Sequence, residues 1–167
     1  LTEATGLTTG AIYGNFENKE ALALSAYEYN SKLLLAKLDE VLGADGSAMD
    51  KVFALTDFYK NYDTFTQNMG GCPILNTGVD AVGNNRLLAA ANREAIKEIE
   101  GKIALVLENG VNNNELKLPV TPLQFAKQMF TIIQGAVAMS TMTRDRKYLI
   151  NTIVYLNVLV KRELKKS

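Results

Sequence analysis

The sequence predicts an all-α protein, and three observations support this fold class. Over long stretches, apolar residues recur at the three- and four-residue spacing of an amphipathic helix. Proline, which breaks helices, occurs only 3 times in 167 residues. Clusters of Gly, Asn and Ser separate the periodic stretches, as expected of turns between helices. A chain of this length is long enough to bury a hydrophobic core.

The first long helix is predicted to begin after Asn18, an N-cap candidate, with Glu20 in its first turn, and to end at about Leu42. The cluster from Gly43 onward ends it, and Ser47 is the N-cap candidate of a second helix over about residues 47–67. This second helix is the most aromatic part of the chain, because it carries Phe58, Tyr59, Tyr62 and Phe65.

The middle of the chain contains a break and a second long helix. Two glycines and a proline interrupt the helical pattern at residues 69–73, and a short segment over 74–81 follows. Asn84 or Asn85 is expected to cap a long helix that continues to about Leu107. The Asn- and Gly-rich residues after 108 are expected to be its fraying end.

Two more helices are predicted at the C-terminal end of the chain. Thr121 is an N-cap candidate, and Pro122 takes the first position of a helix that continues to about residue 141. The last helix ends near Leu164 and is apolar around most of its circumference. We expect it to be buried nearly all round, because a helix without a polar face has no face for solvent.

We expect these two helices to form a dimer interface. The last helix needs a second covering layer, and the helix before it contains small residues that let helices approach closely. Together they fit an isologous interface built as a four-helix bundle. The alternative is that they are two core helices of a monomer, since such pairs also pack inside single bundles. The expected interface residues are Gly135, Ala138, Ile153, Leu156 and Val160.

The composition limits the chemistry that the chain can perform. It has no histidine, so the commonest general base and the commonest zinc ligand are missing, and we expect no catalysis, metal or cofactor. Glu94 and Glu98 have the spacing of paired carboxylates, but with Lys97 between them they have the pattern of a solvated, ion-paired face. A single cysteine, Cys72, cannot form an internal disulfide, which favours the cytoplasm. No apolar run reaches the length of a membrane span.

The N-terminal residues have the pattern of a helix–turn–helix. Leu1–Thr5 would end one helix, Gly6 would take the left-handed position after it, and Thr8 would cap a short second helix. The outer face of that second helix is small and polar, which suits the DNA major groove. The alternative is a surface hairpin without a partner, which the net charge of zero favours. The residues expected to contact DNA are Thr8, Thr9, Gly10, Ala11, Tyr13, Asn15 and Lys19.

This stretch resembles the DNA-binding segment of the tetracycline-repressor (TetR/AcrR) family. Asn15 departs from the family pattern, which often has His or another aromatic residue there. The resemblance implies that a first helix and most of a second precede this point in the family, so we expect the sequence to be N-terminally incomplete. The residues that match the family pattern in register are Gly6, Leu7, Thr8, Gly10, Ile12, Tyr13, Phe16, Lys19, Glu20 and Leu22.

The resemblance implies a function as well as a domain organisation. Residues 1–22 would be the C-terminal part of a helix–turn–helix domain, and residues 23–167 a helical effector-binding and dimerisation domain. The intact protein would be a transcriptional repressor that binds a palindromic operator in double-stranded DNA as a homodimer. A small-molecule effector would release it by moving the helix over 18–42. Two other functions stay open: a helical-bundle enzyme, and a protein-interaction module without DNA binding.

The effector pocket is expected to combine the aromatic second helix, the break near residue 72 and the facing helix. Such a set supplies apolar walls and a few polar groups, as ligand pockets do. An aromatic stripe at helical spacing is also typical of plain core, and we expect Cys72 to be a small buried apolar residue. The candidate residues are Phe58, Tyr59, Tyr62, Phe65, Cys72, Asn76, Phe130 and Gln134.

Overall fold

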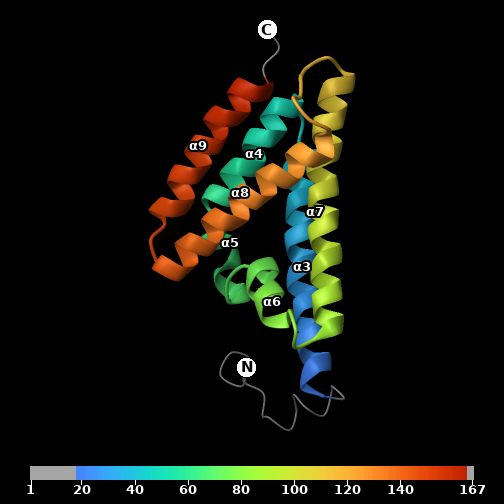
Figure 1. Ribbon diagram of the computed structural model, residues 1–167, viewed down its shortest axis with the longest axis vertical. Helices are drawn as coiled ribbons and strands as arrows, with labels where there is room; N and C mark the ends of the chain where they lie inside the picture. Colours follow the sequence, from blue (N-terminus) through green and yellow to red (C-terminus); the bar gives the residue numbers. More distant parts are fainter. Residues whose placement is uncertain (1–17, 165–167) are drawn as a thin grey trace.

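The computed structural model describes residues 18–164, and all regular elements in that range are helices, as the sequence predicts. The long helices α3 (Lys19–Gly43) and α7 (Arg86–Asn112) lie side by side along the long axis of the molecule (Figure 1). Shorter elements connect them in the sequence: α4 (Ala48–Lys60), α5 (Tyr62–Thr66), the 3-10 turn η1 (Gln67–Met69) and α6 (Pro73–Ala81). The chain continues with α8 (Pro122–Thr143) and α9 (Lys147–Leu164).

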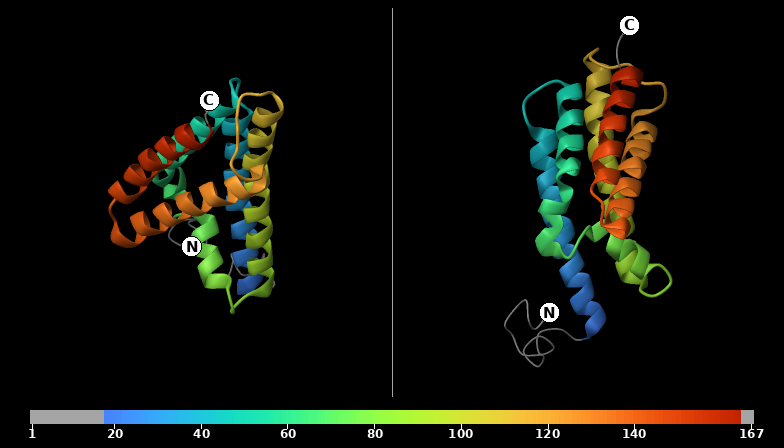
Figure 2. Two further views of the ribbon diagram at one scale, coloured as in Figure 1. Left: turned by 45° about the horizontal axis from the view of Figure 1, so that its top comes forward. Right: turned by 90° about the vertical axis from the view of Figure 1, so that its left-hand side faces the viewer.

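The C-terminal helices pack on α7 and α4. Helix α8 packs obliquely on α7, and α9 lies beside α8 and α4 (Figure 2). The short helix α6 packs on α7 and α3 near the end of the bundle where α3 begins (Figure 1). This arrangement brings α6, α7 and α8 around one region, although they are far apart in the sequence.

The helices begin where side chains can cap them, and the predicted caps are confirmed. The Asn18 side chain accepts a hydrogen bond from the Ala21 N–H at 2.8 Å, and Asn85, rather than Asn84, caps α7. Ser47 and Thr121 each form a capping box with the residue three positions later, so two otherwise unpaired N–H groups are satisfied at each helix start.

The predicted single helix over 47–67 is wrong, because it is divided at Asn61. The Asn61 side chain donates to the carbonyl of Asp57, and its backbone N–H donates to the carbonyl of Phe58, three residues earlier. Asparagine competes in this way with regular helical bonding, which makes it a poor interior residue. The chain therefore changes direction at Asn61, and a separate helix, α5, begins at Tyr62.

The end of α7 also differs from the expectation of fraying. The helix continues to Asn112, and Gly110 is buried where α7 meets the start of α4. A Cβ atom on Gly110 would lie 2.5 Å from the Cβ of Ala48 and 2.7 Å from the Cδ1 of Leu116. The Glu115 carboxylate accepts a hydrogen bond from the Ala48 N–H at 2.6 Å, so this end of α7 is fixed by packing and by hydrogen bonding.

One continuous hydrophobic core joins the long helices to α4, α8 and α9. Burial of this apolar surface is the main stabilising contribution. Each helix contributes residues at three- and four-residue spacing, as the sequence periodicity predicts. Its most deeply buried aliphatic members include Leu34, Leu38, Leu55, Ile99, Ile103, Leu107, Ile133 and Ile153.

Helix α9 is buried on one face and exposed on the other. Its inner face consists of Leu149, Ile153, Leu156, Val160 and Leu164. The opposite face is apolar but exposed, because Val154, Tyr155 and Val158 each keep more than half of their surface open. Within one copy of the chain, only the inner face is covered, and the predicted covering of the outer face by a second subunit stays a prediction.

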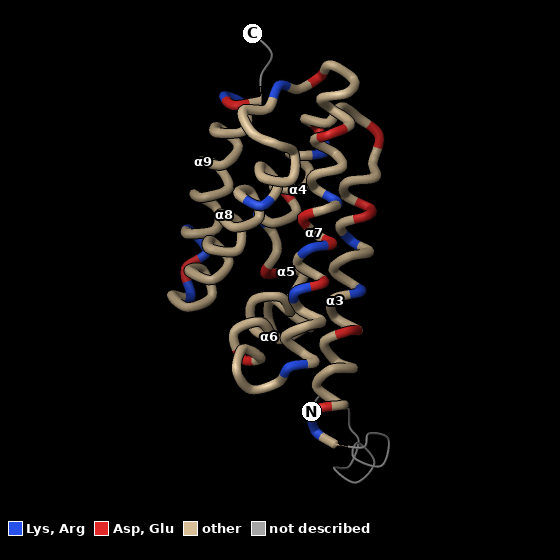
Figure 3. The backbone as a smooth tube through the Cα atoms, turned by 45° about the vertical axis from the view of Figure 1, so that its right-hand side comes forward, with Lys and Arg blue, Asp and Glu red and all other residues tan. Residues whose placement is uncertain are grey.

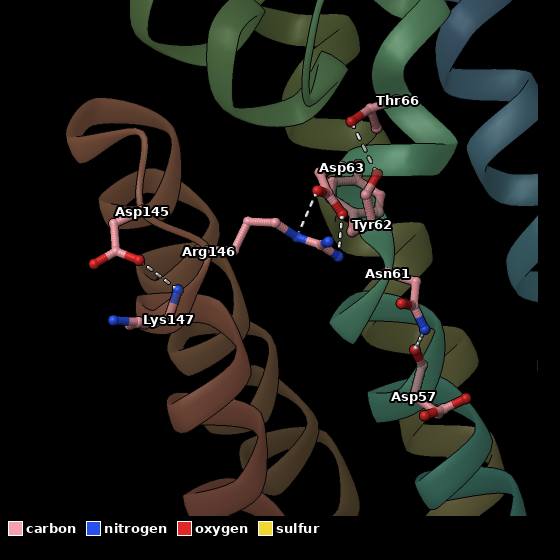
Figure 4. A network of polar contacts seen from close by, with 8 residues as sticks. All are labelled: Asp57, Asn61, Tyr62, Asp63, Thr66, Asp145, Arg146 and Lys147. Carbon is pink, nitrogen blue, oxygen red and sulfur yellow. Dashed lines mark hydrogen bonds and ion pairs between the residues drawn. The ribbon is translucent and has the colours of Figure 1, made fainter.

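An ion pair holds the turn between α8 and α9 against α5. The guanidinium of Arg146 contacts the carboxylate of Asp63 with Nε at 2.7 Å, and it donates a further hydrogen bond at 3.1 Å (Figure 4). Asp145 accepts a hydrogen bond from the Lys147 N–H, which stabilises the first turn of α9 (Figure 4). Both ion-pair side chains are partly exposed, so this contact orients the turn more than it stabilises the fold.

Replacing Gly110 with Ala should destabilise the protein by about 1–3 kcal/mol, because the added methyl group overpacks the α4–α7 contact. Urea unfolding followed by circular dichroism measures this change. Gly101, in the same helix, is the matched control, because a Cβ there meets nothing within 4 Å. Gly101→Ala should stabilise the protein by about 0.5–1 kcal/mol. Equal stability of the two variants would contradict the close packing at Gly110.

Candidate ligand pocket

A pocket of about 630 Å³ lies between α6, α7 and α8. This volume falls within the range that binds small organic molecules. Most of the wall is aliphatic or aromatic, with a few polar side chains among the apolar ones. The lining residues are Ile74, Leu75, Gly78, Val79, Val82, Ala89, Asn92, Arg93, Ile96, Glu100, Phe130, Thr131, Gln134, Gly135 and Ala138.

A chain of hydrogen bonds reaches the pocket from the interior through Cys72. The Tyr62 hydroxyl donates to the Cys72 sulfur at 3.3 Å, and the Cys72 S–H donates to Gln134 Oε1 at 3.7 Å. The sulfur also accepts from the Leu75 N–H, so Cys72 is the N-cap of α6. Burial raises the pKa of the Cys72 thiol, which keeps the thiol protonated and a poor nucleophile. As expected, Cys72 is a buried free cysteine.

Asn92 connects the pocket to α3. It is 5% exposed and lines the pocket, and its Oδ1 accepts a hydrogen bond from the buried Tyr27 hydroxyl of α3 at 3.0 Å. Burial is the largest cause that raises the pKa of Tyr27 to about 12, so this hydroxyl is a donor at neutral pH. Gly78 of α6 faces the other side of the amide, and a Cβ there would lie 2.5 Å from Asn92 Nδ2. Asn92 thus contacts α3 and α6 from its place in α7.

The structure distributes the predicted pocket residues over several places. Phe130 and Gln134 line the pocket, and Tyr62 and Cys72 lie one layer behind it through the hydrogen bonds above. Asn76 closes the preceding loop by donating to the Gly70 carbonyl at 3.0 Å. It lines a different cleft, of about 620 Å³, beside α3.

The predicted aromatic residues form a cluster rather than a pocket wall. The ring centroid of Phe58 lies 5.1–5.6 Å from those of Tyr59, Tyr62 and Phe65, and all three contacts are edge to face. Phe58 and Phe65 face a surface depression that also includes Val41 of α3. Tyr59 is fully buried, and its ring lies 6.5 Å from that of Phe130, which connects the cluster to the pocket.

Sequence reasoning missed the pocket residues on α6 and α7. Val79 and Val82 are about 70% exposed although they are apolar, and Asn92 is a polar residue on the otherwise apolar face of a long helix. An Asn among core positions is the one signal in the sequence that indicates a buried polar contact, because buried polar groups require partners.

The structure places the five predicted interface residues in two different environments. Gly135 and Ala138 line the pocket. Ile153, Leu156 and Val160 are 0–2% exposed, because they pack on α4 and α8 of their own chain. A side chain with no open surface in one copy has none left to bury against a second copy. The periodicity identified an apolar helix but did not distinguish its inner face from its outer face.

The charged residues within 18–164 form pairs along the helices and no metal-binding group. Lys97 pairs with Glu94 at 2.7 Å, and Lys102 pairs with Glu98 at 3.3 Å and with Asp39 of α3 at 2.6 Å. These charges lie mainly on α3 and α7, whereas most of α8 and α9 is uncharged (Figure 3). None of the helices in this range has the length and apolar character that crossing a membrane requires.

The predicted DNA contacts lie mainly outside the described residues. This holds for Thr8, Thr9, Gly10, Ala11, Tyr13 and Asn15. Lys19 is the exposed first residue of α3, next to the Asn18 cap. Lys19 and Tyr27 therefore belong to the same helix, α3, and Tyr27 is the residue of that helix that donates a hydrogen bond to Asn92.

Comparison with known proteins connects this fold to a regulatory family. The family model described as the tetracycline repressor-like C-terminal domain matches residues 48–155. A TetR-family transcriptional regulator from Cytophaga hutchinsonii is 30% identical with a TM-score of 0.87, and the match covers 99% of this chain and 83% of that one. A TetR regulator from Chloroflexus aurantiacus is 26% identical with a TM-score of 0.89, over 99% and 84% of the two chains.

A more distant structure shares the fold alone. The transcriptional regulator FadR from Bacillus subtilis, in complex with stearoyl-CoA, is 18% identical with a TM-score of 0.75. That match covers 95% of this chain and 83% of FadR. No curated protein matches the chain significantly.

The helical bundle and these similarities define an effector-controlled transcriptional regulator. The chain belongs to the tetracycline repressor-like (TetR) family, as the N-terminal motif predicted. Members of this family are DNA-binding repressors that small molecules control, and they are generally not enzymes.

The hydrogen bond between Tyr27 and Asn92 should show a coupling free energy of about 1 kcal/mol in a double-mutant cycle. Asn92→Leu leaves the buried Tyr27 hydroxyl without its acceptor, so this variant should lose about 1–3 kcal/mol of stability. Adding Tyr27→Phe removes the unpaired hydroxyl, so its effect in the Asn92→Leu background should be smaller than in the wild type. Urea unfolding of the four proteins measures the cycle, and strictly additive effects would contradict the contact.

Proposed function

We propose that the pocket between α6, α7 and α8 binds the effector, and that binding there releases the repressor from its operator. One observation carries this proposal: Asn92 lines the pocket and accepts a hydrogen bond from Tyr27 of α3. A ligand that displaces α6 or the Asn92 amide therefore acts on α3 directly. Such a ligand changes DNA binding to the extent that it prefers one arrangement of α3 over the other.

Helix α3 is suited to carry this movement toward DNA. Its 25 residues form one unbroken helix, about 37 Å long at 1.5 Å per residue. Tyr27 lies two turns after Lys19, which belongs to the predicted DNA-contact set. Two recognition helices of a dimer must enter successive major grooves about 34 Å apart, so a shift of a few ångströms at each α3 disturbs both contacts.

We assign the DNA contacts to Thr8, Thr9, Gly10, Ala11, Tyr13, Asn15 and Lys19, because their pattern matches the recognition segment of the family. Small residues let the backbone approach the groove, and hydroxyl, amide and ammonium groups donate to phosphates. A palindromic operator follows from two-fold symmetry if the protein binds as a homodimer. We place this activity in the cytoplasm, where a regulator meets the DNA, and we propose regulation rather than catalysis.

We propose that the homodimer forms through the outer face of α8 and α9. Val154, Tyr155 and Val158 of α9 are 54–62% exposed, and Met139 and Met142 of α8 are also open. Residues 128–143 and 148–160 contain no charged side chain, so this exposed surface is unusually apolar for one facing solvent. The buried residues Ile153, Leu156 and Val160 position this face from the inside.

The DNA-binding function is tested by selecting duplexes from a random pool with the full protein at low salt. We expect enrichment of a palindrome whose half-site centres are about one helical turn, or a multiple of it, apart. Lys19→Ala should weaken binding to the selected duplex and reduce the slope of log affinity against log salt by about 1. Lys32→Ala, an exposed lysine further along α3, is the control and should leave the slope unchanged. Failure to enrich any duplex would refute the proposal.

Val158→Glu should produce a folded monomer in sedimentation velocity, because the new carboxylate would be buried without a partner at the centre of the outer face. Leu105→Glu is the matched control, since Leu105 of α7 is similarly exposed, and this variant should remain dimeric. Ile153→Ala should instead lower stability by about 2–5 kcal/mol, as expected for a core truncation. A dimeric Val158→Glu protein would exclude this face as the interface.

A further inference from the structure

We infer that the effector is an amphipathic monoanion, a carboxylate on an apolar body, and that Arg93 at the mouth of the pocket binds the carboxylate. The inference rests on the proposed role of the pocket as the effector site. It adds the chemical class of the ligand and the residue that selects it.

The first step is the position of Arg93. It belongs to the pocket lining and is an exposed residue of α7, so its charge lies where the pocket opens to solvent. The residues three and four positions away on the same helix, where an ion-pair partner would lie, include no acid. Within residues 18–164, the Arg93 guanidinium forms no ion pair.

The second step is the location of the acids on the three pocket helices. Helix α8 contains no acid, and the one acid of α6, Asp80, lines the separate cleft beside α3. On α7, Glu94 and Glu98 pair with lysines of the same helix. Glu108 follows Arg93 by about four helical turns. None of these four carboxylates therefore compensates the charge of Arg93.

The one acid in the pocket lining, Glu100, already has a partner. Its side chain is 15% exposed, and its carboxylate lies 3.9 Å from the ammonium of Lys127. It follows Arg93 by two turns, which places the two residues about 10 Å apart along the helix axis. The end of the pocket at Arg93 therefore has an uncompensated positive charge.

The walls near this charge are apolar. Ile96 of α7 lies on the same face of the helix as Arg93, and Val79 and Val82 line the pocket from the side of α6. A guanidinium binds a carboxylate through two parallel hydrogen bonds, and the apolar walls suit an apolar body. One uncompensated base matches one negative charge, whereas a dianion would bring a second charge without a counterion.

The inference is tested with phenylbutyrate, phenylbutanol and phenylbutylamine, which share a skeleton but are anionic, neutral and cationic at neutral pH. Equilibrium dialysis of the full protein at low salt gives the three dissociation constants. We expect phenylbutyrate to bind about fivefold more tightly than phenylbutanol, which equals about 1 kcal/mol, the upper value for an exposed ion pair. Phenylbutylamine should bind most weakly, because its ammonium meets a like charge. High salt should reduce these differences by screening.

Arg93→Gln should lower the ratio of the phenylbutyrate and phenylbutanol affinities to about 1. Arg86→Gln is the matched control, since Arg86 is an exposed arginine of the same helix outside the pocket lining, and its loss changes the net charge equally. This control should keep the fivefold ratio. The inference is overturned by equal affinities in the wild type, by a ratio that survives Arg93→Gln, or by no binding of phenylbutyrate up to its solubility limit.

Val79→Trp separates failure of the ligand class from failure of the pocket itself. Val79 lines the pocket and is 70% exposed, so the larger side chain should occupy the pocket at little cost in stability and weaken all three ligands. Equal affinities that Val79→Trp weakens would refute the ligand class and leave the pocket as the effector site. Affinities that Val79→Trp does not change would refute both proposals.

Discussion

The packing of α3 against α7 is the contact on which the rest of the molecule depends. Leu34 and Leu38 of α3 and Ile99 and Ile103 of α7 have almost no open surface, and this shared core keeps two long helices in one register. The same pairing sets Asn92 opposite Tyr27. Because interiors are close-packed and resist gradual deformation, the proposed mechanism expects a change on the pocket side of α7 to move α3.

The local features of this fold could be read from the sequence because they depend on neighbouring residues. Asn18, Ser47 and Thr121 cap helices through hydrogen bonds within one turn, and short patterns identify them. Asn61 divides a helix for an equally local reason, but its effect competes with a strong aromatic periodicity that indicated a continuous helix. The N-terminal motif identified the family because its residues are adjacent in the sequence.

The pocket and the outer face could not be read in the same way, because tertiary packing decides them. Phe130 and Gln134 were predicted as lining residues, but their partners on α6 and α7 become neighbours only when three helices meet. Ile153 and Val154 are adjacent and both apolar, and only the position of α4 and α8 makes one of them core and the other surface. Periodicity indicates that a helix has apolar faces and does not indicate what will cover each one.

The short helix α6 has a consequence for how this regulator can diversify. It contributes Val79 to the pocket, and Val82 follows its last turn, yet both side chains are about 70% exposed and lie outside the core. Substitutions there would change the shape of the proposed ligand site at little cost in folding free energy, since exposed positions tolerate replacement. The hydrogen bond that connects the pocket to α3 is made instead by the buried Asn92 of α7. Ligand preference can therefore evolve on one helix while the response to binding is preserved on another.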